Sequence, residues 1–119
     1  MWLRPKFLLH LEGGVVLALS VLLYSQAHAG WGRFALLLLA PDLSMFGYLL
    51  GTRAGAACYN VIHTYALPLL LVGYALLFGH SGLMPYALIW TAHIGMDRLL
   101  GYGLKYPTAF KDTHLQRLD

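Results

Sequence analysis

The sequence is poor in charged residues, and this shortage separates it from water-soluble domains. Only 11% of its 119 residues are Asp, Glu, Lys or Arg, whereas 59% are hydrophobic. Soluble domains carry about 25% charged residues, and a chain this short has too little interior to bury so much apolar surface. We therefore expect a single domain whose main solvent and partner is the lipid bilayer.

Cysteine is almost absent as well. Cys58 stands alone, which excludes an internal disulfide. The basic residues are few and scattered, with a net charge of +3 for the whole chain. Most of them flank apolar runs, as residues that determine membrane topology do. We therefore expect no nucleic acid as a partner.

Four apolar segments are long enough to cross a bilayer, which takes about 20 helical residues. They cover residues 5–27, 31–50, 53–78 and 83–104. Short connections between them make each helix run antiparallel to the one before it, and Pro41 and Pro68 lie inside spans, where membrane helices tolerate proline. The expected fold is all-α: a polytopic, antiparallel bundle of four transmembrane helices over residues 1–104, followed by a polar tail over residues 105–119.

The distribution of Lys and Arg predicts the orientation of this bundle. With the N-terminus inside, only Arg33 lies at the outer face. The basic residues on the cytoplasmic side are then Arg4, Lys6, Arg53, Lys105, Lys111 and Arg117. The positive-inside rule therefore places both termini in the cytoplasm. We expect Arg98, near the end of the last span, to turn toward the cytoplasmic headgroups.

Six polar residues lie at a similar distance from the cytoplasmic ends of the expected helices. They are Glu12, Asp42, Asn60, His63, His93 and Asp97. With a helical rise of about 1.5 Å per residue they span only ~6 Å in depth. An ionisable group near the membrane centre costs at least ~2.5 kcal/mol, so separate exposure of these groups to lipid would oppose insertion. We expect them to face one another inside the bundle.

The spacing and chemistry of this group favour a metal site. His93 and Asp97 are four residues apart on one helix face, and Asn60 and His63 are three apart on another. Imidazole and carboxylate ligands suit Zn, Mn or non-haem Fe, and a bound ion makes a coordinated water nucleophilic. The predicted ligands are His63, His93, Asp97 and Asp42. Asp42 or Glu12 would act as a general base, and Asn60 is an accessory candidate.

Three stretches resemble a bacterial family of uncharacterised membrane proteins. They are APDLSMFGYLLG (residues 40–51), YNVIHTYALP (59–68) and AHIGMDRLLGYGLKYPTAFKDTHL (92–115). Over nearly its whole length the chain is similar to the family catalogued as domain of unknown function 4260. This resemblance implies a multi-pass protein of the bacterial inner membrane, and it carries no settled activity.

A second resemblance concerns chemistry. Pro41-Asp42, His63-Thr64 and the pair His93 and Asp97 are similar in order to the P-D, H-T and H-x-x-x-D motifs of a family described as membrane-bound metal-dependent hydrolases. This chain is shorter, and Ser44 stands where a second acid often follows the first. Asp112 and His114 would compensate if the tail folds back, because its extended reach is roughly 25 Å.

Four functions are compatible with these features. The first is a small metal-dependent membrane hydrolase acting on a lipid or lipid-linked substrate. The second is a transporter or channel subunit, working as a homo-oligomer, in which the same groups relay protons or bind a cation. The third is a structural or partner-binding subunit. The fourth, a haem protein with His63 and His93 as axial ligands, is disfavoured by the acidic neighbours Asp42 and Asp97. We rank the functions in this order.

Overall fold

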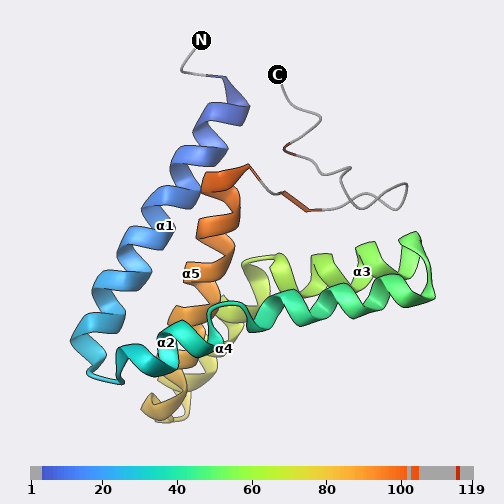
Figure 1. Ribbon diagram of the computed structural model, residues 1–119. Helices are drawn as coiled ribbons and strands as arrows, with labels where there is room; N and C mark the ends of the chain where they lie inside the picture. Colours follow the sequence, from blue (N-terminus) through green and yellow to red (C-terminus); the bar gives the residue numbers. More distant parts are fainter. Residues whose placement is uncertain (1–3, 102, 105–114, 116–119) are drawn as a thin grey trace.

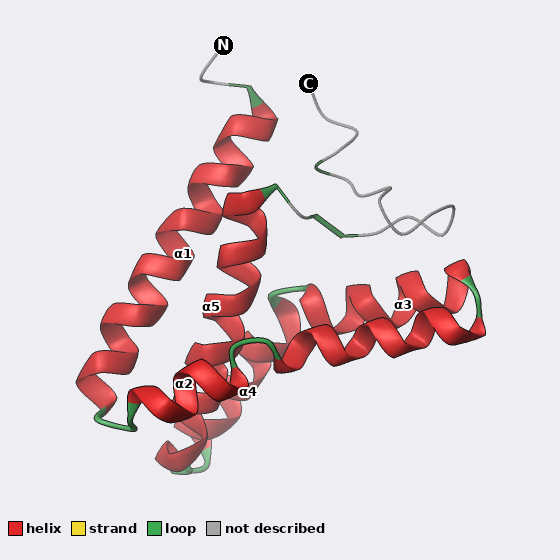
Figure 2. Ribbon diagram, in the orientation of Figure 1, coloured by secondary structure: helices red, strands yellow, loops and turns green. Residues whose placement is uncertain are grey.

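The computed structural model describes residues 4–101, 103–104 and 115 (Figure 1). All regular elements within these residues are helical, which confirms the all-α fold class for this part of the chain (Figure 2). In chain order they are α1 (Pro5–Ala27), α2 (Trp31–Leu37), the 3₁₀ helix η1 (Ala40–Leu50), α3 (Thr52–His63), α4 (Ala66–Leu77), the short 3₁₀ turn η2 (Ser81–Leu83) and α5 (Met84–Leu100).

Two prolines explain why the second and third expected spans are each divided. A proline ring inside an α-helix clashes with the carbonyl four residues earlier. Counting back four from Pro41 gives Leu37, where α2 ends, and counting back four from Pro68 gives Thr64, which is extended and separates α3 from α4. Residues 31–50 and 53–78 are therefore not two straight helices, and the prolines mark their breaks.

The longest helix, α1, packs against α5 in the opposite direction. His10 meets Leu99 near one end of the pair, Gly13 meets Gly95, and Ser20 meets Thr91 further along. The Gly13 and Gly95 positions bring the two backbones into direct contact: a Cβ atom added at Gly95 would lie 2.7 Å from the carbonyl oxygen of Gly13. The close packing requires glycine at both positions, as is common between membrane helices.

An apolar core forms at the end of α5 that is distant from Gly95. Tyr24, Leu88 and Ile89 are buried there, together with partly buried residues of α2. The Tyr24 hydroxyl donates a hydrogen bond of 2.5 Å to the carbonyl of Gly30, and its ring packs against Trp31 and Phe34 at 5.1 and 5.0 Å. This aromatic cluster fixes the turn between α1 and α2.

The helices η1 and α3 form a hairpin that turns at Gly51, where φ is +119°. In Figure 1 this hairpin extends to the side of the α1–α5 pair and lies across its direction. The ring of Tyr48 packs directly on Gly55, and Gly47 packs against Cys58. A compact antiparallel bundle of four spans is therefore not confirmed: α1 and α5 form one pair, and η1 and α3 form another that crosses it.

Among the described residues, three helical stretches are long and apolar enough to cross a membrane: Pro5–Ala27, Trp31–Leu50 and Thr52–Leu77. Large apolar side chains on them are highly exposed, for example Leu36 at 81% and Leu77 at 82%. Contiguous exposed apolar surface marks contact with an apolar partner, which indicates a membrane environment. The fourth expected span corresponds to α5, which has 17 residues and lies largely buried among the other helices.

The contact between α1 and α5 leads to a test of stability. We expect Gly95→Ala to destabilise the fold by about 2 kcal/mol, because the added methyl group forces the two backbones apart. Unfolding of the purified protein in detergent, followed by circular dichroism, measures the effect. Gly73→Ala on α4 is the matched control, since its added Cβ would meet no atom within 4 Å. Equal stability of the two variants would contradict the packing described here.

Candidate metal centre

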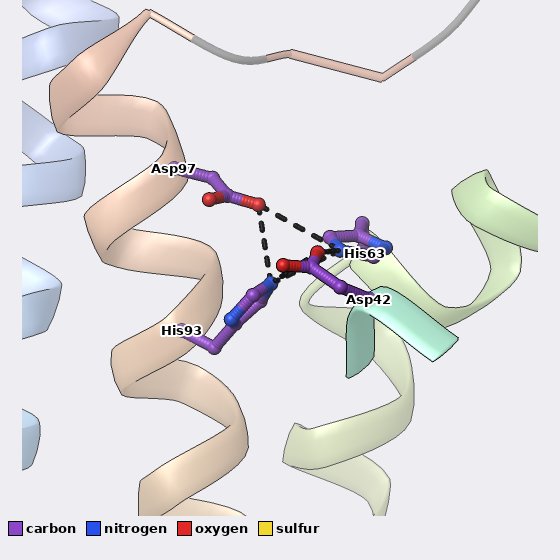
Figure 3. A group of neighbouring side chains, drawn as sticks. All are labelled: Asp42, His63, His93 and Asp97. Carbon is purple, nitrogen blue, oxygen red and sulfur yellow. Dashed lines mark hydrogen bonds and ion pairs between the residues drawn. The ribbon is translucent and has the colours of Figure 1, made fainter. Parts of the chain in front are cut away.

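Four of the predicted site residues meet where the hairpin reaches α5 (Figure 3). Asp42 lies in the first turn of η1, and His63 is the last residue of α3. His93 and Asp97 project from one face of α5, one turn apart. The site is thus assembled from three segments that are separate in the sequence.

The side-chain tips of these residues converge on one point. One potential ligand atom from each residue lies within 4.8 Å of the others. The two Nε2 atoms of His63 and His93 are 3.1 Å apart, and each is 3.1 Å from Oδ1 of Asp42. Oδ2 of Asp97 lies 3.2 Å from Nε2 of His93 and 3.6 Å from Nε2 of His63.

Both imidazole rings are oriented by main-chain carbonyls. Nδ1 of His63 lies 2.9 Å from the carbonyl oxygen of Tyr59, and Nδ1 of His93 lies 2.6 Å from that of Leu38. A carbonyl oxygen can only accept, so each Nδ1 carries the hydrogen. In a neutral imidazole the lone pair is then on Nε2, the atom that points into the site. Metal-binding histidines are commonly held by this kind of contact.

The break before η1 supplies one of these carbonyls. In a continuous α-helix the Asp42 amide would bond to the carbonyl of Leu38, four residues back. Instead it donates to Leu39 at 3.0 Å. The carbonyl of Leu38 is thereby free to accept from His93. The same local change that turns the chain into a 3₁₀ helix therefore anchors a ring on a different helix.

The electrostatics of the group favour a cation at its centre. Two aspartates carry a formal charge of −2 when ionised, and two neutral imidazoles add lone pairs but no charge. Placing such groups together away from water is costly unless they are paired or coordinate a metal. A divalent cation would make the formal charge of the four side chains and the ion zero.

Access to the site is one-sided. The side chains of His63 and His93 have no exposed surface, and that of Asp97 is 10% exposed. The Asp42 side chain is 33% exposed. Within the described part of the chain the two histidines are enclosed and Asp97 is nearly so, and Asp42 marks the side from which a small molecule can reach them.

Three further side chains support the site and were not identified by sequence analysis. The ring of Tyr59 stacks on His63 at 3.7 Å, and its hydroxyl donates to Oδ2 of Asp97 at 3.4 Å. Trp90 and Arg98 of α5 donate to the carbonyls of Ile62 and His63 at 2.7 and 3.0 Å. These are the last carbonyls of α3, which have no partner within their own helix.

Arg98 corrects one of our expectations. It was expected at the headgroups, but it is 7% exposed, and its guanidinium lies 5.9 Å from the centre of the Tyr65 ring. The end of a broken helix presents unpaired carbonyls that attract a cation. The sequence contained a signal for two of the supporting side chains: Tyr59 lies four residues before His63, on the same helix face, and Arg98 directly follows Asp97.

The four remaining predicted site residues are Glu12, Asn60, Asp112 and His114. The Glu12 side chain is exposed on α1, and Glu12 is not part of the four-residue cluster. Asn60 lies on α3, three residues before His63, and is half-buried. Asp112 and His114 of the tail lie outside the described residues. Roles for these four residues stay predictions.

The described residues define a class: a helical protein whose apolar helices are long enough to cross a membrane and whose buried group of two histidines and two aspartates could hold a metal ion. The chain belongs to the family described as "Domain of unknown function (DUF4260)", which it matches over residues 6–118. No curated protein and no solved structure matches the chain.

The contact between Arg98 and α3 can be tested by substitution. We expect Arg98→Met to lower the free energy of unfolding by about 2 kcal/mol, because the His63 carbonyl loses a charged donor in a buried position. Arg98→Lys, which keeps a cationic donor, should recover part of the loss. Arg53→Met removes an exposed arginine from α3 and serves as the control. If both Met variants unfold alike, the Arg98 contact does not stabilise the hairpin.

Proposed function

We propose that the protein binds one divalent transition-metal ion, Zn, Mn or Fe, through His63, His93, Asp97 and Asp42. The convergence of two inward-facing Nε2 atoms and two carboxylates carries this proposal. Metal–ligand bonds of about 2.0–2.1 Å in a tetrahedral site place neighbouring ligand atoms roughly 3.3 Å apart. The separations of 3.1–3.6 Å between the imidazole nitrogens and their neighbours agree with that value.

The same separations argue against haem. Axial histidines lie on opposite sides of the iron, and bonds of about 2 Å would hold their nitrogens about 4 Å apart. The two Nε2 atoms are only 3.1 Å apart. This distance suits two neighbouring positions on one ion, which favours a non-haem metal.

Metal content tests this part of the proposal. Elemental analysis of the purified protein should find about one Zn, Mn or Fe per chain, and His93→Ala or His63→Ala should remove most of it, since three ligands bind far more weakly than four. His80→Ala changes an exposed histidine between α4 and η2 and is the matched control. Metal that persists in both site variants, or that is lost equally in the control, would refute the assignment.

We further propose that the bound ion serves the hydrolysis of a lipid or lipid-linked ester. For hydrolysis, Asp42 would yield its place on the ion to a water, while His63, His93 and Asp97 hold the metal, and the ion would make that water nucleophilic at neutral pH. Asp42 is suited to accept a proton from that water, because within the described chain its side chain is the most exposed of the group, at 33% against 10% for Asp97. Hydrolysis would join the water oxygen to the acyl carbon or phosphorus and break the bond to the leaving oxygen, and that oxygen would take the proton held by Asp42, which restores the carboxylate.

The membrane setting completes the proposal. The apolar stretches would place the site where amphiphilic substrates reach it from the bilayer. We retain the bacterial inner membrane as the location, with both termini in the cytoplasm, from the distribution of basic residues.

Transport of protons or cations is the second candidate, because the same groups could relay protons. A path across the membrane needs access from two sides. Within the described chain the group is reached through Asp42, and the other three members are enclosed. This one-sided access favours binding and catalysis over transport, unless contacts between copies in a homo-oligomer open a second side.

An activity assay distinguishes these candidates. Metal-loaded protein in lipid nanodiscs should release product from one class within a panel of fluorogenic lipid esters and phosphodiesters. Asp42→Asn should lower the rate by at least about 100-fold, since general base catalysis contributes 10²–10⁴-fold. Glu12→Gln tests the other predicted base. If this variant loses activity and Asp42→Asn does not, the general base is Glu12 and not Asp42. Proton or metal flux into liposomes, without turnover of any ester, would favour the transporter.

A further inference from the structure

A groove lies beside Asp42 on the surface of η1. It has a volume of about 440 Å³, and its lining residues are Leu39, Asp42, Leu43, Phe46, Tyr48 and Leu49. Asp42 is the only charged residue among them, and it is also the accessible member of the candidate metal centre. The groove therefore connects an apolar surface directly to the reactive group.

The geometry of η1 makes the apolar wall of this groove straight. A 3₁₀ helix has three residues per turn, so side chains three positions apart lie in one row. Leu43, Phe46 and Leu49 form such a row, and Asp42 begins the neighbouring one. At about 2.0 Å per residue the apolar row is roughly 12 Å long. In an α-helix the same side chains would still be neighbours, but each would be offset by about 60° from the last, so that the row would be oblique to the axis.

This row combines an unusual type of helix with high exposure, which it shares with the other apolar stretches. A 3₁₀ helix of 11 residues is unusual, because its hydrogen bonds are poor and most runs end after three or four residues. In addition, Leu43, Phe46 and Leu49 are 63%, 67% and 83% exposed. The apolar row is therefore open to apolar molecules beside the site.

We propose that this row, Leu43–Phe46–Leu49, holds the hydrocarbon chain of the substrate. The apolar row begins at Leu43, directly after Asp42 of the site. The substrate class is therefore an amphiphile whose hydrolysable bond lies at the polar end of its hydrocarbon chain. The chain would lie along η1, and the bond to be cleaved would lie at the His/Asp group. This inference rests on the proposed function and adds to it the position and orientation of the substrate.

A larger cavity of about 620 Å³ between α1, α4 and α5 is the alternative place for a hydrocarbon chain. Its buried hydroxyl groups, Ser20 and Thr91, satisfy each other through a hydrogen bond of 2.7 Å. None of the four residues of the metal centre lines it. A chain bound there would have no reactive group at its end, so the groove on η1 is the better candidate.

Photolabelling locates the chain directly. The probe is a medium-chain alkyl hydroxamate that carries a diazirine at the end of its tail, used with metal-loaded full-length protein in nanodiscs. The hydroxamate binds the metal, and light attaches the tail to whatever it touches. We expect labelled peptides to be enriched in residues 43–49, relative to an alkyl diazirine without the hydroxamate, and acetohydroxamate to compete. Enrichment over α1 and α4, or none, would overturn the inference.

Substitution of the row provides a second measurement. We expect Phe46→Ser to keep its metal and its affinity for acetohydroxamate, but to bind the alkyl hydroxamate about tenfold more weakly, as expected for loss of one large apolar contact. Leu76→Ser removes a similarly exposed side chain on α4, which is 71% exposed, and should leave both affinities unchanged. An equal loss of affinity for the alkyl hydroxamate in the two variants would show that its tail contacts the bilayer and not the η1 row.

These experiments separate the two levels of the proposal. A chain without bound metal, or one that does not bind acetohydroxamate when loaded, would refute the proposed function and the substrate track with it. A loaded chain that binds acetohydroxamate and leaves its η1 row unlabelled by the tail would refute the track alone.

Discussion

Two prolines inside apolar segments release the main-chain carbonyls on which the buried site is anchored. Pro41 ends the α-helical pattern before η1, and the freed carbonyl of Leu38 holds the ring of His93. Pro68 is preceded by the break at Thr64, and the last carbonyls of α3 are bound there by side chains of α5. The helix breaks therefore create acceptors, and those acceptors orient the histidines and hold the hairpin against α5.

The polar contacts around the site also set a condition on its occupancy. In a membrane, a buried imidazole or carboxylate is tolerated when it has a partner. Here each histidine has a carbonyl on one ring nitrogen and shares a small space with two carboxylates on the other side. The outer contacts are made within the protein, whereas the inner atoms are all acceptors when the rings are neutral. A positive charge at the centre would satisfy these acceptors.

The residues of the candidate site could be predicted from the sequence because ionisable residues inside apolar segments are scarce and strongly constrained. The i,i+4 spacing of His93 and Asp97 and the cost of separate exposure led to the four residues that the structure brings together. The arrangement of the helices could not be predicted in the same way. The depth of each residue was estimated by counting along helices that were taken to be straight. This estimate did not predict the crossing hairpin, and it grouped Glu12 with the four site residues. The inward turn of Arg98 depends on a carbonyl that only the break at Thr64 exposes.

The order in which the site residues emerge during synthesis has a consequence for assembly. Chains are made from the N-terminus, so early segments exist before later ones. Asp42 and His63 are therefore synthesised before α5, which brings His93, Asp97 and Arg98. Until that last helix arrives, the hairpin lacks every α5 donor that binds it and two of its four site residues. The four-residue group is therefore complete only after α5 has been synthesised.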